Sequence, residues 1–460
     1  MFIKSGMSSL VQKYNVAGPR YTSYPTVPYW EETSFTKSDW ESSVIKSVSE
    51  SNSNEGISLY IHLPFCEAMC TFCGCNKRIT LNHHVEQPYI SNVLKEWSLY
   101  LALLDETPVI SELHLGGGTP TFFSPANLKL LVDGIFKSAD KAKNAALSFE
   151  GHPNNTTKEH LKTLFELGFN RVSYGVQDYN LEVQKAIHRV QPFENVLNAT
   201  LNAREIGYKS VGHDLIYGLP FQKKEHVIHT IKQTIALKPD RIAFYSYAFV
   251  PWIKGNGQRG FSQENLPSPD EKRAQYEIGK QMLEDAGYIE IGMDHFALKS
   301  DELNLAMETK KLHRNFMGYN SSSTQAMIGL GVSSISDSWY GFSQNVKSIT
   351  EYKELLDQDK IPVYRGHLLN REDLIIRKHI LNLMCHFETQ WVKNGELYID
   401  EIPDILISLK EMEEDGLLYL DANRITVTEK GRPFVRNICM AFDLRLKRKK
   451  PNTQLFSMTI

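Results

Sequence analysis

The sequence predicts an α/β protein whose main sheet is built from alternating strands and helices. Three observations predict it: short β-rich runs recur over about the first 250 residues, helical patterns separate them, and polar or glycine residues follow the runs. Strands that alternate with helices pair in parallel through right-handed crossovers. This pattern leaves two architectures open, an open doubly wound sheet and a barrel-like (β/α) array.

Six runs rich in β-branched and aromatic residues are expected to form the strands. They are Ile57–Leu63, Val109–Leu115, Ala145–Phe149, Arg171–Val176, Ser210–Ile216 and Arg241–Tyr247. A cysteine-rich loop follows the first run, and a glycine-rich turn, Gly116–Pro120, follows the second. Because sites in (β/α) barrels are built at the C-terminal ends of the strands, these two segments are the first candidates for function.

Three helices are expected between these runs. In the first two, apolar residues recur three and four positions apart, as on the buried face of an amphipathic helix. The third begins after the N-cap residue Thr157 and ends before Gly168. The apolar positions are Ile90, Val93, Leu94, Trp97 and Leu101 in the first helix, and Leu128, Leu131, Val132 and Ile135 in the second, which starts at Ser124-Pro125.

The pattern changes twice along the chain, which predicts three parts. Residues 1–50 show little periodicity and predict an irregular N-terminal arm, whereas residues 51–369 are expected to form the main domain, with a barrel core at about 57–250 and an extension beyond it. Residues 370–460 predict a small, mainly helical C-terminal domain. Its expected elements are helices over Leu374–Phe387, Ile405–Glu414 and Val435–Leu446, and a hairpin of Leu417–Leu420 with Ile425–Val427.

Composition excludes several classes of protein. The formal charge is −3, and 42% hydrophobic with 23% charged residues is ordinary for a globular chain, which excludes disorder and nucleic-acid packaging for the chain as a whole. The basic run Lys447–Lys450 is better explained by cations near a helix C-terminus than by nucleic-acid binding. Neither an apolar stretch of 18 residues nor a secretory signal occurs, so we expect a soluble, cytoplasmic protein without a membrane span.

Four of the six cysteines, Cys66, Cys70, Cys73 and Cys75, lie within ten residues of one another. Clustered thiols in a chain without a secretory signal indicate metal binding or catalysis rather than disulfides. The first three have the spacing C-x3-C-x2-C, and thiolates are the usual ligands of iron–sulfur clusters. Three ligands leave one iron open to an exogenous group. Zinc is the alternative, but this segment lacks the distant second pair of ligands that structural zinc sites use.

The role of Cys75 is not fixed by its spacing. It lies two positions beyond Cys73, so the spacing alone allows it to be a fourth ligand of a closed cluster.

The cysteine segment after the first strand, together with the glycine-rich turn after the second, resembles the radical S-adenosylmethionine superfamily. Over nearly the whole chain, the sequence further resembles the oxygen-independent coproporphyrinogen III oxidase family. The stretches that carry this resemblance are PRYTSYPT at 19–26, FCGCNK at 72–77, GGGTP at 116–120, GVQD at 175–178, DLIYGLP at 214–220, GMDHF at 292–296, LHRNF at 312–316 and NICM at 437–440.

The resemblance implies a partial (β/α)6 radical S-adenosylmethionine barrel with one 4Fe-4S cluster and two molecules of S-adenosylmethionine. Cys66, Cys70 and Cys73 match the cluster ligands, and the first S-adenosylmethionine binds the remaining iron through its amino and carboxylate groups. The residues that match contacts of the first S-adenosylmethionine are Tyr60, Phe72, Gly117, Glu150 and Ile335. Those that match contacts of the second are Gly118, Thr119, Gln177, Arg189, Asp214 and Ala248.

The implied reaction is oxidative decarboxylation of two propionates of coproporphyrinogen III to vinyl groups, which gives protoporphyrinogen IX. A 5′-deoxyadenosyl radical removes hydrogen from the propionate β-carbon, and loss of one electron then expels carbon dioxide. Cys75 lies outside the family's ligand set, and we expect it to be catalytic, near the substrate. Because the substrate carries four carboxylates, the cationic side chains of Arg20, Arg314 and His313 are candidates for binding it.

Three positions depart from the pattern expected of this family. Leu115 stands before the glycines in place of an aromatic residue, His152 follows Glu150 in the cofactor loop, and His188 precedes Arg189. The departure at His152 touches the cofactor loop, so it bears on the details of S-adenosylmethionine contact and leaves the cluster ligands unchanged.

Two other functions within the superfamily are open alternatives, a haem-binding chaperone and a haem-degrading radical methylase. Cys75 and the family stretches near both ends of the chain favour the oxidase over the chaperone. The family further implies a flavodoxin-type electron donor, a monomer and no nucleic-acid partner.

Overall fold

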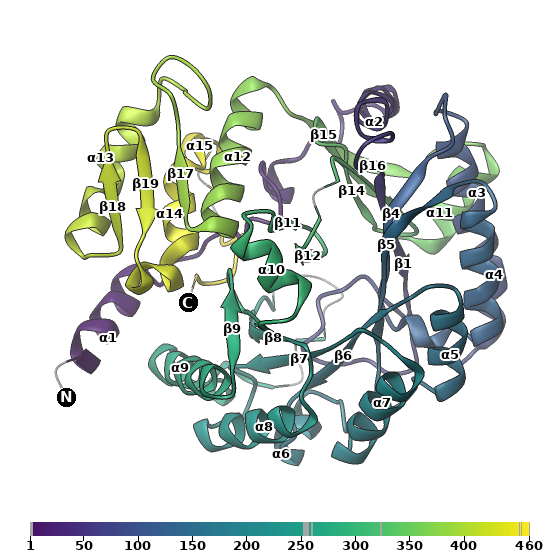
Figure 1. Cartoon of the computed structure of the whole chain (residues 1–460), viewed down its shortest axis with the longest axis horizontal. Helices are drawn as coiled ribbons and strands as arrows, with labels where there is room; N and C mark the ends of the chain where they lie inside the picture. Colours follow the sequence, from purple (N-terminus) through teal and green to yellow (C-terminus); the bar gives the residue numbers. More distant parts are fainter. Residues whose placement is uncertain are drawn as a thin grey trace.

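The computed structural model describes residues 3–251, 257–258, 261–322, 324–449, 451 and 453–459 of the 460-residue chain, with residues 3–8 described by their backbone alone. A twelve-stranded sheet dominates it, in the order β16-β15-β14-β13-β1-β4-β5-β6-β7-β8-β10-β9. The sheet curls into a partial barrel, whose edge strands β16 and β9 are not neighbours in that order (Figure 1).

Seven neighbouring strands pair in parallel and form the barrel wall. They are β13 (Ala326–Leu330), β1 (Ile57–Leu63), β4 (Val109–Gly117), β5 (Asp140–Gly151), β6 (Arg171–Gln177), β7 (Ser210–Tyr217) and β8 (Arg241–Ser246). Antiparallel strands extend the sheet at both edges: β14 (Ile335–Asp337), β15 (Gly341–Asn345) and β16 (Val363–Leu368) on one side, and β10 (His295–Leu298) and β9 (Tyr288–Ile291) on the other.

Helices connect the parallel strands and cover the outer face of the barrel (Figure 1). They are α3 (Glu86–Leu101), α4 (Pro125–Phe136), α5 (Lys158–Glu166), α6 (Leu181–Ala186), α7 (Phe193–Ile206) and α8 (Lys224–Leu237). Three further helices belong to the extension beyond residue 250: α9 (Pro269–Asp285), α10 (Glu302–Glu308) and α11 (Ile349–Asp357). The Ser124 side chain caps α4 by accepting from the backbone N–H of Asn127, and Thr157 caps α5 in the same way from His160.

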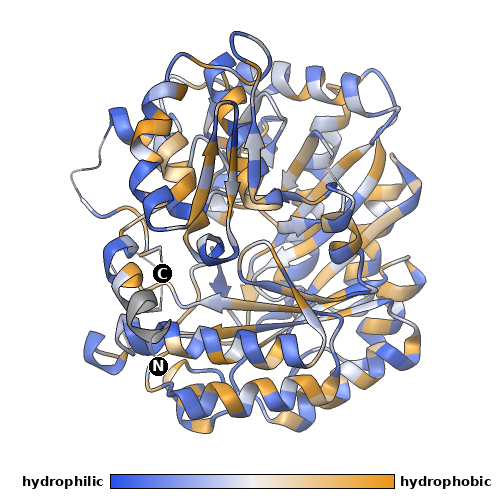
Figure 2. Cartoon of the chain, turned by 60° about the vertical axis from the view of Figure 1, so that its left-hand side comes forward, coloured by the Kyte–Doolittle hydropathy of each residue, from blue (hydrophilic) through white to orange (hydrophobic). Residues whose placement is uncertain are grey.

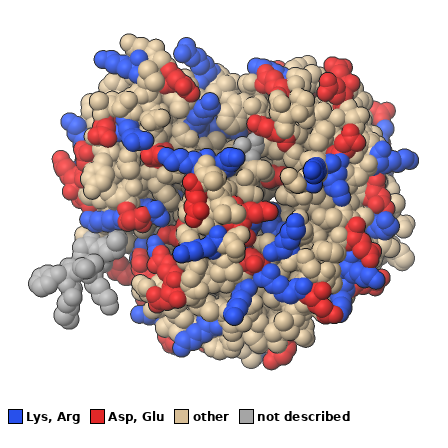
Figure 3. Space-filling view, in the orientation of Figure 1, with Lys and Arg blue, Asp and Glu red and all other residues tan. Residues whose placement is uncertain are grey.

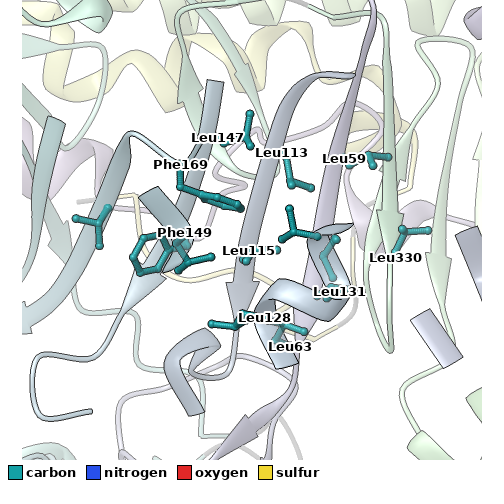
Figure 4. Packing of buried hydrophobic residues seen from close by; sticks show 14 of the residues in the cluster. Leu59, Leu63, Leu113, Leu115, Leu128, Leu131, Leu147, Phe149, Phe169 and Leu330 are labelled. Carbon is teal, nitrogen blue, oxygen red and sulfur yellow. The ribbon is translucent and has the colours of Figure 1, made fainter. Parts of the chain in front are cut away.

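The two faces of the barrel strands differ because successive side chains of a strand point to opposite sides. On β4 and β5, Leu113, Leu115, Leu147 and Phe149 point outward and are buried against the helices, among them α4 with Leu128 (Figure 4). The residues between them point into the barrel and are mostly polar. Hydropathy coloured along the chain shows the matching pattern on the helices, which carry hydrophobic residues in stripes (Figure 2).

The six expected strands and three expected helices are confirmed, with ends that differ by a few residues. The partial barrel resolves the two architectures that the sequence left open. The extension beyond residue 250 adds β13 as a seventh parallel strand beside β1, with Tyr60 opposite Gly329. The sequence pattern did not predict this pairing, because the two strands lie far apart along the chain.

The prediction of an irregular arm over residues 1–50 is wrong in its secondary structure. The segment contains two helices, α1 (Ile3–Tyr14) and α2 (Lys37–Ser51). Thr36 and Asp39 form a capping box at the start of α2, and its Trp40, Val44 and Val48 pack into the barrel core. The apolar stripe is four residues apart and is interrupted by serines, which hid it from a search for periodicity.

The C-terminal region has a core of its own. Its elements are α12 (Arg371–His386), β17 (Glu388–Gln390), α13 (Ile402–Glu414), β18 (Leu418–Asp421), β19 (Arg424–Val427), α14 (Val435–Phe442) and α15 (Leu444–Arg448). They enclose a hydrophobic cluster to which the N-terminal segment also contributes Leu10, Tyr14, Tyr21 and Tyr24. The first 50 residues thus belong to two cores, and the domain limits at 50 and 369 stay predictions.

In the described part of the chain, every helix is too short or too polar to cross a lipid bilayer. On the face shown in Figure 3, acidic and basic side chains are interspersed.

Candidate active site

Three cavities meet inside the barrel at the side chain of Glu150, near the C-terminal end of β5. We call them the cysteine cavity, of about 460 Å³, the Tyr60 cavity, of about 570 Å³, and the inner cavity, of about 130 Å³. Cys66, Cys70 and Cys73 line the first, and Cys75 lies between the first and the second. The rim expected from the sequence is therefore hollow, and the four clustered cysteines lie on it.

The cysteine loop is held from three directions. Its start belongs to β2 (Phe65–Cys66), which pairs with β3 (Arg78–Ile79) beyond the loop. The backbone N–H of Thr71 donates to the carbonyl of Ile187 at 3.0 Å. Lys77 Nζ donates to the carbonyl oxygens of Cys73, at 3.1 Å, and Cys75, at 3.4 Å. These contacts fix the loop backbone while the thiols face the cavity.

The glycine-rich turn packs directly under this loop. Gly117 has φ +108°, which favours glycine, and a Cβ there would lie 2.7 Å from the His62 ring. A Cβ on Gly118 would lie 2.7 Å from the backbone of Pro64. Thr119 Oγ1 lies 3.4 Å from Cys66 Sγ, within hydrogen-bond reach. Side chains at these two positions would therefore collide with His62 and Pro64, and glycine lets the turn pack closely against the segment before the cysteine loop.

Glu150 is surrounded by groups from neighbouring strands. Its Oε2 accepts from the backbone N–H of Gly117 at 3.3 Å, and its Oε1 lies 3.6 Å from His114 Nε2. The His114 ring stacks on Tyr60, with centroids 6.0 Å apart. Tyr60 and Ile335 both line the Tyr60 cavity. Four of the five residues expected around the first S-adenosylmethionine thus share the Tyr60 cavity with Cys75. The fifth, Phe72, lines the cysteine cavity.

A second group lies across the cysteine cavity, on β6, β7 and the segment after α6. Gln177 ends β6 with φ +69°. The Arg189 guanidinium donates to the carbonyl of Gly175 at 2.6 Å and reaches Cys70 Sγ at 3.8 Å, while its buried Nε has no hydrogen-bond partner in the described part of the chain. Ser173 Oγ donates to Asp214 at 2.9 Å.

Several of these groups have shifted pKa values. Burial, followed by the charge of Glu150, raises the pKa of Asp214 to about 7, against the hydrogen bond from Ser173. Burial lowers the pKa of His152 to about 3, with a smaller effect from Arg189, so this histidine is neutral. The thiols of Cys73 and Cys75 share a hydrogen bond. This hydrogen bond lowers the pKa of Cys73 and raises the pKa of Cys75.

The donor set fits the groups that the sequence predicts. Three thiols face one cavity, yet within the described residues no three metal-binding side chains converge closely enough to share a single ion. That arrangement suits a cluster with one thiolate on each of three irons better than one zinc ion. The Arg189 guanidinium lines the same cavity and is a donor suited to an anionic group.

Four expected site residues lie outside the three cavities, as far as the described residues show. Ala248 follows β8, and its carbonyl accepts from Gln258. Arg20 pairs with Asp294 at 3.3 Å, and Arg314 donates to the Arg20 carbonyl at 3.4 Å. His313 lies on the short strand β11 (His313–Asn315), which pairs with β12 (Gly318–Asn320).

Sequence reasoning missed three side chains that the structure brings to the site. His114 contacts Glu150, His62 Nδ1 lies 3.1 Å from the Tyr60 hydroxyl, and Ser173 binds Asp214. Each lies two positions from, or directly across from, a residue that was predicted. The signal that finds them is the alternation of polar and apolar residues along each strand.

Comparison with known proteins agrees with this geometry. The sequence pattern of the radical SAM superfamily matches residues 60–234. An oxygen-independent coproporphyrinogen III oxidase from Helicobacter pylori J99 is 40% identical over 440 residues, which cover 95% of this chain and 96% of that protein. The protein of the same name from Escherichia coli K12 is 38% identical over 98% of both chains.

A solved structure extends the likeness to the fold. The coproporphyrinogen III oxidase of Escherichia coli, described in its title as a radical SAM enzyme, superposes with a TM-score of 0.87 and 36% identity, over 93% of this chain and 98% of that one.

The chain belongs to the oxygen-independent coproporphyrinogen III oxidase family. The expected resemblance and the expected barrel are thereby confirmed. Membership makes the chain a radical SAM oxidoreductase, which uses a 4Fe-4S cluster and S-adenosylmethionine.

Proposed function

We propose that the chain converts coproporphyrinogen III to protoporphyrinogen IX in haem biosynthesis, by oxidative decarboxylation of two propionates to vinyl groups. One observation carries the proposal: in a chain similar to named oxidases over nearly its whole length, the four cysteines and the glycine-rich turn line one cavity. For each propionate, a hydrogen atom leaves the β-carbon, one electron is lost and the carboxylate departs as carbon dioxide.

Cys66, Cys70 and Cys73 hold the cluster in this proposal. When bound, the cluster and S-adenosylmethionine supply a 5′-deoxyadenosyl radical for the hydrogen abstraction. The residues proposed to contact this S-adenosylmethionine are Tyr60, Phe72, Gly117, Glu150 and Ile335. Glu150 accepts from the amino group, and the bare backbone at Gly117 permits close approach of the ligand. Tyr60 excludes water from one side, because its ring stacks on His114.

A second S-adenosylmethionine is part of the proposal. Gly118, Thr119, Gln177, Arg189, Asp214 and Ala248 are proposed to contact it. Arg189 is supported by its position on the cysteine cavity, where its guanidinium can donate to the methionyl carboxylate. Asp214 is supported by its position between the cysteine and inner cavities, where its carboxylate can accept from ribose hydroxyls. Ala248 has the weakest support, because it lies outside these cavities in the described part of the chain.

Cys75 is proposed to act on the substrate rather than on the cluster. Its side chain is exposed where the cysteine and Tyr60 cavities meet, whereas the three other thiols line the cysteine cavity only. Arg20, His313 and Arg314 are proposed to bind substrate carboxylates. Support comes from the contact of Arg314 with the Arg20 backbone, which places two cationic residues together.

The electron donor is proposed to be a flavodoxin-type protein, and the enzyme is proposed to act as a cytoplasmic monomer without a nucleic-acid partner. The mixed charges of the face in Figure 3 support the last point.

Anaerobic reconstitution with iron and sulfide, followed by product analysis, tests the proposal. With S-adenosylmethionine and a reductant, coproporphyrinogen III is expected to yield protoporphyrinogen IX, carbon dioxide, 5′-deoxyadenosine and methionine. Stable haem binding without turnover, in samples with an intact cluster, would establish the chaperone instead. An opened or methylated tetrapyrrole would establish the methylase.

A further inference from the structure

Arg171 is the cation inside the barrel that the proposed site leaves without a function. It begins β6, and its side chain lines the inner cavity. Its Nη2 donates to Ser148 Oγ at 3.0 Å, but within the described residues it forms no ion pair. Arg241, which lines the same cavity, differs because Asp301 accepts from its Nε at 2.8 Å.

The acidic groups whose charges act on Arg171 are engaged elsewhere. Asp301 and Glu302 both pair with Arg241. Glu112 accepts from the hydroxyls of Ser58, at 2.6 Å, and Ser322. Glu150 and Asp214 lie higher in the barrel, at the level assigned to S-adenosylmethionine. A guanidinium removed from water without an acidic partner is costly. Burial accordingly lowers the pKa of Arg171 to about 10, which still leaves it charged at neutral pH.

The register of the sheet places this cation directly below the cofactor level. Arg171 lies opposite Ser148 on β5, and Ser148 lies two residues before Glu150 on the same face of that strand. At about 3.3 Å per residue, the backbone positions of Ser148 and Glu150 are about 7 Å apart. The inner cavity shares Glu150 with both other cavities and Asp214 with the cysteine cavity.

The walls of the inner cavity suit a pyrrole side arm. His295 and Tyr245 face it from β10 and β8. His295 Nδ1 donates to the Met293 carbonyl at 2.9 Å, so its Nε2 accepts from the Tyr245 hydroxyl at 3.2 Å. Both rings are fixed and neutral, and neither competes for the charge of Arg171.

We propose that Arg171 binds one carboxylate of the tetrapyrrole substrate, with the inner cavity as the pocket for that propionate arm. The inference rests on the proposed function, because it takes the anion to be a substrate propionate. Such a contact orients the macrocycle so that another propionate β-carbon faces the cofactor level. It assigns to the inner cavity a cation in addition to Arg20 and Arg314, which do not line that cavity.

The test compares the reconstituted wild type with Arg171→Gln, Arg171→Lys and a control, Arg204→Gln, whose guanidinium pairs with Asp240 outside these cavities. Arg171→Gln is expected to raise the KM for coproporphyrinogen III by about 10-fold to 100-fold, the loss of one charge-assisted contact. Arg171→Lys should recover part of this loss, and Arg204→Gln should keep the wild-type KM. Iron content and 5′-deoxyadenosine formation should remain normal in all four proteins.

Two further measurements separate anchoring from a structural role. If Arg171 only balances Glu112, Arg171→Gln will lower the melting temperature, leave KM within twofold of wild type and be rescued by Glu112→Gln, and the inference falls. Binding of fluorescent coproporphyrin III is measured in parallel. If wild type does not turn over the porphyrinogen but binds the porphyrin in an Arg171-dependent way, the proposed reaction fails while the carboxylate site stands. If neither KM nor porphyrin binding depends on Arg171, the inference is wrong.

Discussion

The outer and inner faces of the same barrel strands obey different rules. On β5, Phe149 points outward, is fully buried and contacts the rings of Phe169 and Tyr208. Its neighbours Ser148 and Glu150 point inward and line cavities. Adjacent residues therefore serve stability and chemistry separately. One face holds the strands to the helices, and the other carries groups that packing alone does not require.

This division explains how polar groups are tolerated at the centre of the fold. The inward-pointing polar groups form hydrogen bonds with one another. Ser173 donates to Asp214, and His114 Nδ1 lies 2.8 Å from Ser148 Oγ. Where polar side chains such as Arg189 line a cavity, a ligand can supply further hydrogen-bond partners.

The largest expected effect concerns the cysteine loop, which lies at the C-terminal ends of the barrel strands. Cys66→Ala, Cys70→Ala and Cys73→Ala should each abolish the 4Fe-4S cluster, whereas Cys75→Ala should keep near-normal iron and sulfide but lose activity. The reason is that a fourth thiolate would block the iron that binds S-adenosylmethionine. Iron and sulfide content and the electron paramagnetic resonance signal, measured side by side, check this. Equal loss in Cys75→Ala would contradict the open-iron assignment.

The outer face should respond in stability alone. Phe149→Ala removes a fully buried ring and is expected to cost about 3–5 kcal/mol of unfolding free energy. Denaturant unfolding of the cluster-free protein measures it. Ser148→Ala, the adjacent inward position, is the comparison variant and should cost less, about 1–3 kcal/mol, because it removes hydrogen bonds and leaves no large hole. A similar cost at both positions would break the proposed division between the faces.

The inner face should respond in ligand binding. Arg189→Ala is expected to weaken S-adenosylmethionine binding at the second site by about 1.5–3 kcal/mol, the value of a charge-assisted hydrogen bond. Cluster content should not change. Equilibrium binding resolved into two sites checks this, and unchanged affinity at both sites would remove Arg189 from the proposed contacts.

Much of this division could be predicted from local sequence, because strand alternation and helix caps are local signals. The limits of β1 and the cap at Thr157 are examples. Contacts distant in sequence could not be predicted. Arg20 meets Asp294, 274 positions later, so a residue chosen for its charge is paired within the protein. The helix α2 was missed because its apolar stripe is sparse, and tertiary packing of Trp40 stabilises it.

The site shows the same limit. The cysteine spacing and the glycine turn indicated the cofactor, but Arg171 attracted no attention in the sequence, where it is one more residue at the start of a strand. Its meaning depends on its being inward, unpaired among the described residues and below Glu150, which only the register reveals.

The smallest expected effect is a pH dependence that sharpens the comparison, because it arises from burial on the polar face. Burial raises the pKa of Asp214 to about 7, so its carboxyl is mostly protonated at pH 6 and mostly ionised at pH 8. If the ionised form accepts from S-adenosylmethionine, affinity at the second site should increase up to about tenfold between pH 6 and pH 8. Asp214→Asn should bind S-adenosylmethionine weakly and without this pH dependence.

The effect of pH on stability has the opposite sign. Because the raised carboxyl pKa favours the protonated folded state, the ligand-free protein should lose stability as pH rises from about 4 to 7, and Asp214→Asn should lose less. The affinity for S-adenosylmethionine and the free energy of unfolding, each measured at both pH values, check these two trends. Affinity that falls as pH rises would show that Asp214 does not bind the cofactor as a carboxylate.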